Sequence, residues 1–94
     1  MTDALKQKII TAAQSRVSQY QEIYASRYSN AEELADYFIK AASIFERNGW
    51  GEDEIFEQVS SSMGGFLLGK KYGVSPEQYA SNCLRIRAEQ KGQQ

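Results

Sequence analysis

Apolar side chains recur at intervals of three and four residues along four stretches of this chain. That spacing is typical of helices with one buried face. We expect the first helix to run from Asp3 to Ala25 or Ser26 and the second from Ala31 to Arg47. A third helix follows Gly51 and is ended by Gly73, and a fourth begins at Pro76 and frays at residues 92–94.

Residues with strong end preferences support these boundaries. Asp3 is suited to cap the first helix, because a side-chain oxygen there can accept a hydrogen bond from a free backbone N–H. Gly49 can take the left-handed conformation that commonly ends a helix. Ser75 followed by Pro76 is a strong start signal, since proline fits the first helical position. The turns between the predicted helices are therefore short.

The width of a helix's apolar face predicts where that helix lies in the fold. The second helix is apolar over a wide arc and should lie at the centre of the bundle. Trp50 follows it between two glycines, and we interpret it as a lid on the core. In the fourth helix the apolar face is expected at Tyr79, Cys83 and Ile86, with Arg87 in solvent. Cys83 itself is expected to be a small buried residue. The apolar face of the first helix consists of Leu5, Ile9, Ala13, Val17, Tyr20 and Tyr24.

Composition agrees with one small folded unit. The chain has 94 residues, of which 41% are hydrophobic and 24% charged. These values are ordinary for a globular domain and wrong for a disordered one. A single proline and little clustering of β-branched residues argue against a β-sandwich. We therefore predict a single all-α domain over residues 1–94, a small bundle of about four helices joined by short connecting turns.

Missing residue types restrict the chemistry. The chain has no histidine and one cysteine, Cys83. Histidine-based triads, most zinc and haem sites, and an internal disulfide are thereby excluded. We expect no catalytic residue, no cofactor and no metal, and therefore no enzyme. The first residues lack the apolar core of a signal peptide, and no window reaches transmembrane length. These features predict a soluble protein of the reducing cytoplasm, without a membrane partner.

Small residues form an unusual seam in the third helix. Ser61, Gly65 and Gly69 are spaced by four, so they share one helical face. Each glycine costs about 1 kcal/mol relative to alanine within a helix, which indicates a packing reason for keeping it. Three interpretations remain open: a close crossing with another helix of the same chain, a surface for self-association or a partner, and a break in the helix near Gly64.

A second motif lies at the end of that helix. Residues 68–79 read LGKKYGVSPEQY, with a small residue at Gly69, the turn Tyr72-Gly73-Val74 and a buried apolar position at Tyr79. This arrangement resembles the turn of the helix-turn-helix DNA-binding family. The family places a further apolar residue where this chain has Asn82. The resemblance implies that the fourth helix enters the major groove of DNA. It assigns base contacts to Gln78, Ser81, Asn82 and Arg85 and phosphate contacts to Lys70, Lys71 and Arg87.

The main functional hypothesis is protein binding. Residues 28–60 carry eight acids against two bases, whereas residues 61–94 carry five bases against two acids. Small chains without catalytic groups are often inhibitors, immunity proteins or adaptors, and aromatic anchors with a polar surround are the usual arrangement at their interfaces. The partner would be another protein of unknown identity, a homodimer is plausible, and DNA is the alternative partner. The candidate protein-binding residues are Tyr24, Tyr28, Glu32, Glu33, Asp36 and Trp50.

Overall fold

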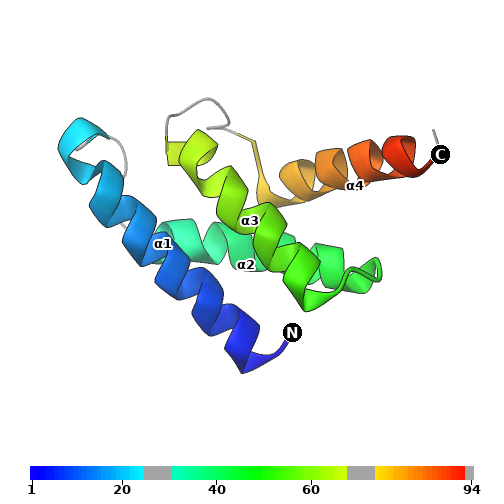
Figure 1. Ribbon diagram of the computed structural model, residues 1–94, viewed down its shortest axis with the longest axis horizontal. Coiled ribbons are helices and arrows are strands. Elements are labelled where there is room, and N and C mark those ends of the chain that lie inside the picture. The colour runs from blue at the N-terminus through cyan, green and yellow to red at the C-terminus, as the bar shows by residue number, and fades with distance from the viewer. Residues whose placement is uncertain (25–30, 68–73, 93–94) are drawn as a thin grey trace.

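A computed structural model describes residues 1–24, 31–67 and 74–92 of the chain, apart from some side chains near the ends of the helices. It contains four α-helices, α1 (Asp3–Tyr24), α2 (Ala31–Arg47), α3 (Glu52–Leu67) and α4 (Pro76–Gly92), and no strand in these ranges (Figure 1). The prediction of an all-α fold is confirmed. The bounds of α2 and the start of α4 at Pro76 also agree with the sequence pattern.

Two of the predicted helix ends are confirmed and one is wrong. Gly49 has φ of 86°, the left-handed conformation expected after α2. The Ser75 hydroxyl oxygen accepts a hydrogen bond of 3.0 Å from the backbone N–H of Gln78 and so caps α4. At α1, however, the cap is Thr2, whose hydroxyl oxygen accepts a 3.2 Å bond from the N–H of Leu5. Asp3 is instead the first helical residue, where its charge still favours the helix N-terminus.

Helix α2 occupies the centre, as its wide apolar arc predicts. It packs against α1, α3 and α4, and α1 and α3 also pack against each other. In Figure 1, α4 extends away from α1 and ends near the C-terminus. The molecule is thus a three-helix unit with α4 added to α2, an open array with extents of 42 × 28 × 20 Å. Among the side chains that the structure describes, the largest fully buried ones are Phe38, Phe45, Ile9, Ile55, Met63 and Val59.

A buried tyrosine connects α4 to the rest of the core. The Tyr79 ring lies edge-on to Phe38, with 5.5 Å between the ring centroids. Its hydroxyl donates a 2.6 Å hydrogen bond to the Ser62 hydroxyl, which donates one of 2.9 Å to the Gln58 carbonyl oxygen. Burial raises the pKa of Tyr79 to about 12, since the charged form would lose its hydration. The hydrogen bonds explain why a polar residue, Ser62, is tolerated in the buried face of α3.

In α4 the buried face differs from the expected one. Ile86 was expected in the core, yet 47% of its surface is exposed. Arg87 was expected in solvent, yet its side chain is only 26% exposed. Cys83 and Leu84 are half-buried against the core. The helix is therefore rotated so that Arg87, rather than Ile86, continues the inward-facing row that contains Cys83.

Candidate protein-binding groove

Trp50 is a lid on the core, and the structure shows how it is held. It stacks on Phe45 with 4.4 Å between the ring centroids and 13° between the ring planes. Its backbone N–H donates a 3.1 Å hydrogen bond to the Phe45 carbonyl oxygen, which closes the turn after α2. The ring therefore caps the C-terminal end of α2 while part of it remains in contact with solvent.

Arg87 covers the other side of Trp50. The guanidinium carbon lies 4.3 Å from the centre of the ring, a cation–π arrangement. Its Nη2 atom pairs with the carboxylate of Glu54 on α3. Its Nη1 atom is buried and has no hydrogen-bond partner among the described residues. A buried donor without a partner costs about 1–3 kcal/mol, which offsets part of what the ion pair and the stacking contribute.

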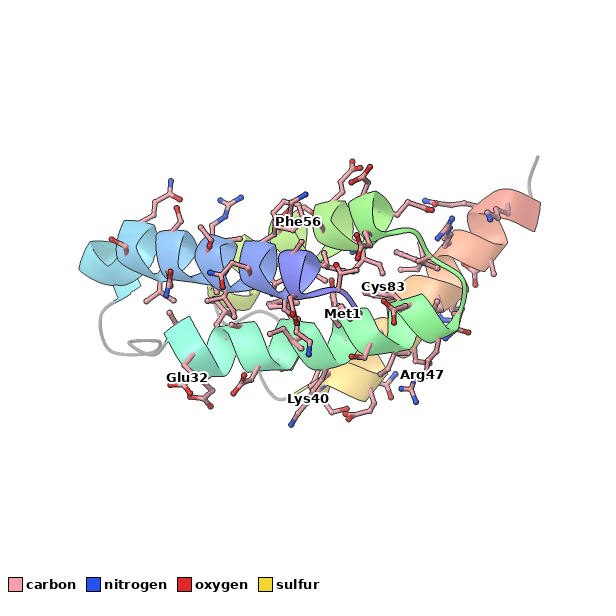
Figure 2. The ribbon with its side chains drawn as sticks, turned by 90° about the horizontal axis from the view of Figure 1, so that it is seen from below. Met1, Glu32, Lys40, Arg47, Phe56 and Cys83 are labelled. Carbon is pink, nitrogen blue, oxygen red and sulfur yellow. The ribbon has the colours of Figure 1, made fainter. Side chains whose placement is uncertain are left out.

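These three residues form one end of a groove between α3 and α4. The groove has a volume of about 440 Å³. Small side chains, Ser61 of α3 and Cys83 of α4, contribute to its lining, and the exposed Ile86 forms part of its α4 wall. Cys83, labelled in Figure 2, is half-buried against the hydrophobic core. Among the described residues, the lining consists of Trp50, Glu54, Glu57, Gln58, Ser61, Cys83, Ile86, Arg87 and Gln90.

A second groove lies between α1 and α3 and is more apolar. Its volume is about 510 Å³, and its lining is Ala4, Gln7, Lys8, Thr11, Ala12 and Phe56. Phe56 is already half-buried, and the ammonium group of Lys8 lies 5.9 Å from the centre of its ring. Figure 2 shows Phe56 on the side of the molecule opposite Lys40. This groove is therefore the more apolar of the two, whereas the α3–α4 groove contains Ile86, the large hydrophobic side chain that is exposed among the described residues.

The structure does not bring the predicted protein-binding residues together. Glu32, Glu33 and Asp36 are exposed on the N-terminal part of α2, whereas Trp50 follows its C-terminal end. Figure 2 shows Glu32 and Arg47 at opposite ends of this helix, which is 17 residues and thus about 25 Å long. The acids therefore do not surround Trp50. Of the two other predicted anchors, the side chain of Tyr24 and the whole of Tyr28 lie outside the described residues.

The small-residue seam is only partly visible. Helix α3 continues to Leu67, so it does not break at Gly64. Ser61 is exposed and lines the α3–α4 groove, so at this position the seam is not a close crossing of two helices. Gly65 lies one turn further along the same helix, but its surroundings, like Gly69, are outside the described residues. The interpretation of the seam as a surface for self-association or a partner stays a prediction.

The predicted DNA-contacting residues lie on α4 where they are described. Gln78, Ser81 and Arg85 are exposed and Asn82 is half-buried. The Gln78 amide donates a 2.9 Å hydrogen bond to the Asn82 side-chain oxygen, and Arg85 pairs with Glu89 at 3.3 Å. Helix α4 packs on α2 rather than along α3. Lys70, Lys71 and the turn glycine lie outside the described residues, so DNA binding stays a prediction.

Sequence reasoning missed most residues of the groove. Of the candidate protein-binding residues the groove contains Trp50, together with Ser61 from the seam and Arg87, which was assigned to DNA phosphates rather than to this site. Arg87 could have been found, because it lies four residues after Cys83 and eight after Tyr79, on the same helical face. Nothing in the sequence marked Glu54 as part of the groove, because an acid in the first turn of a helix is already explained by its favourable interaction with the helix N-terminus.

The described residues show neither a metal site nor a membrane-spanning helix. No three His, Cys, Asp or Glu side chains in this part of the chain are grouped so that they could hold a metal ion. Likewise, no helix within it combines the length and hydropathy needed to cross a bilayer. Comparison of the chain with protein-family models, with curated proteins and with solved structures finds no match.

Proposed function

We propose that this chain is a small non-enzymatic binding protein of the inhibitor, immunity or adaptor type. Its partner protein would dock in the groove between α3 and α4, and it would act in the reducing cytoplasm. The observation that supports this function most directly is the exposure of Ile86, with 47% of its surface open beside a groove. Among the described residues it is the one large hydrophobic side chain that is so exposed.

The composition of the groove supports the same proposal. Tryptophan and arginine are the residues most enriched among the energetic centres of protein interfaces, and here Trp50 and Arg87 lie in contact. Both are fixed before binding, Trp50 by its stack on Phe45 and Arg87 by its pair with Glu54. Preorganised side chains lose little conformational freedom on association. Covering the exposed part of Ile86 would contribute roughly 1 kcal/mol.

The proposal is tested by comparing two variants of the immobilised protein in the capture of partners from its own cells. Ile86→Asp places a charge in the groove, whereas Glu77→Lys changes an exposed charge in the first turn of α4, outside the groove lining. Both positions are exposed, so both variants should fold, and a thermal melt verifies this. We expect a partner that wild type and the Glu77 variant retain and the Ile86 variant loses. Equal recovery on all three proteins would exclude the groove as the binding site.

A further inference from the structure

We infer that the partner segment is a basic amphipathic helix, with an aliphatic side chain against Ile86 and a Lys or Arg side chain against Glu57. This inference rests on the proposed function, because it names the chemistry of what the groove between α3 and α4 would hold. Three features of the groove support it: the charge of its α3 wall, the cation that it already contains, and its dimensions.

The α3 wall of the groove is acidic. Helix α3 carries Glu52, Asp53, Glu54 and Glu57 and no basic residue. All four are exposed. Glu54 is compensated by Arg87, but the Glu57 carboxylate lines the groove as an exposed acid. A partner that approaches over α3 therefore meets negative charge, and complementary charge on the partner would speed its association and determine its orientation.

The groove already contains one cation in a defined arrangement. The Arg87 guanidinium lies on the face of Trp50 and pairs with Glu54. An aromatic face together with a carboxylate is a favourable environment for Arg and Lys. Arg87 thus occupies both Glu54 and the second face of Trp50, so the acid of the lining that a partner's basic side chain would contact is Glu57.

The dimensions of the groove fit a helix. From Glu54 to Ser61 on α3, and from Cys83 to Gln90 on α4, the lining extends over about 10 Å, roughly two helical turns. Ser61 and Cys83 have small side chains, so a helix backbone can approach closely between the two walls. Docking of an amphipathic helix between two helices is a common mode of peptide recognition, in which one or two apolar anchors enter the groove. Ile86 is placed to contact such an anchor.

Two designed peptides of equal length test the inference. They share one face of leucine and alanine, and the polar face carries lysine in one and glutamate in the other. Trp50 is the only tryptophan of the chain and lines the groove, so its fluorescence reports binding. We expect the lysine peptide to change the Trp50 emission, with an affinity that falls as salt is added. Ile86→Asp and Glu57→Lys should each weaken this binding at least tenfold, whereas the control Glu77→Lys, at an exposed position outside the groove lining, should change it less than twofold.

Each other outcome has a distinct meaning. Equal binding of both peptides, or loss in the Glu77 variant as large as in the Glu57 variant, would overturn the basic partner but leave the groove as a protein-binding site. Absence of any change in Trp50 emission with either peptide also overturns the inference. A change of emission with protein concentration alone would identify a second copy of the chain as the occupant. If the capture of a partner from cells is also unaffected by Ile86→Asp, the proposed function fails together with the inference.

Discussion

The guanidinium carbon of Arg87 lies 4.3 Å from the centre of the Trp50 ring, although 37 positions of the sequence separate the two residues. This contact connects the middle of α4 to the turn between α2 and α3. The Glu54 carboxylate, which pairs with the same guanidinium, adds a connection to α3. Together with the buried Tyr79, which bonds to Ser62, Arg87 thus helps to hold α4 in place relative to α3 and to the turn after α2.

Replacing Arg87 should therefore loosen α4. Arg87→Ala removes a cation–π contact and an ion pair that is only partly exposed, and we expect it to lower the free energy of unfolding by about 1–2 kcal/mol. Urea denaturation measures this change. Arg85→Ala is the matched control, since Arg85 pairs with Glu89 in solvent and should contribute less than about 0.5 kcal/mol. Equal losses in the two variants would show that the stacking on Trp50 contributes little.

Gly49 and Gly51, on either side of Trp50, should differ in their tolerance of a side chain. Gly49 has φ of 86°, so Gly49→Ala should cost about 1 kcal/mol through backbone strain alone, because nothing lies within 4 Å of the added Cβ atom. At Gly51 the added Cβ would meet Glu54 Oε1 at 3.8 Å, an ordinary contact. Gly51→Ala should therefore be close to neutral in a thermal melt. A larger loss at Gly51 than at Gly49 would contradict the turn geometry.

Stability at high pH should depend on Tyr79. Its pKa is raised from 10.0 to about 12, chiefly because the ring is buried, so the unfolded chain loses this proton first as the pH rises. The free energy of unfolding should be unaffected by this group below pH 10 and should fall between pH 10 and 12, by about 3 kcal/mol in total. Urea midpoints at a series of pH values measure the fall.

Tyr79→Phe separates this effect from other titrations. The variant keeps the ring but lacks the ionising hydroxyl, so its stability should fall less steeply over the same pH range. Some dependence should remain, because burial also raises the pKa of Tyr37. At neutral pH the variant loses one hydrogen bond to Ser62, at a cost of about 1 kcal/mol. If the variant lost stability above pH 10 as steeply as wild type, the pKa of Tyr79 would not differ between the folded and the unfolded chain.

A larger residue at Ser61 should affect binding rather than folding. The side chain is exposed in the groove, so Ser61→Leu should change the free energy of unfolding by less than about 0.5 kcal/mol. It would nevertheless fill part of the groove, and we expect it to reduce retention of the partner. Ser18→Leu, at an exposed position of α1, provides the control for added hydrophobic surface. A strong loss of stability at Ser61 alone would restore the interpretation of the seam as a helix crossing.

Local signals in the sequence predicted the helices well. Gly49 and Pro76 act through their own backbone, and Ser75 acts through a hydroxyl that reaches the N–H of Gln78, so these effects are local and do not depend on the rest of the fold. The central place of α2 followed from the width of its apolar arc, and the role of Trp50 as a lid followed from its position in a short turn. At α1 the error was one position, because Thr2 and Asp3 are both capable caps.

The groove could not be predicted, because its residues are brought together only by tertiary packing. In α4, a face through Tyr79, Cys83 and Ile86 and a face through Tyr79, Cys83 and Arg87 are both consistent with helical spacing. Hydrophobicity favours the first. The structure has the face that includes Arg87, because the guanidinium lies on the Trp50 ring and pairs with the Glu54 carboxylate. Both partners are distant in the sequence, and neither carried a signal for this contact.

Photo-crosslinking from position 86 tests the central claim, binding at the α3–α4 groove, most directly. A photoreactive phenylalanine analogue would replace Ile86 in one variant and the exposed Lys40 of α2 in the other. After irradiation in the protein's own cells, we predict a covalent adduct with one partner from position 86 and none from position 40. Adducts from position 40 alone, or the same adducts from both positions, would contradict a partner seated in this groove.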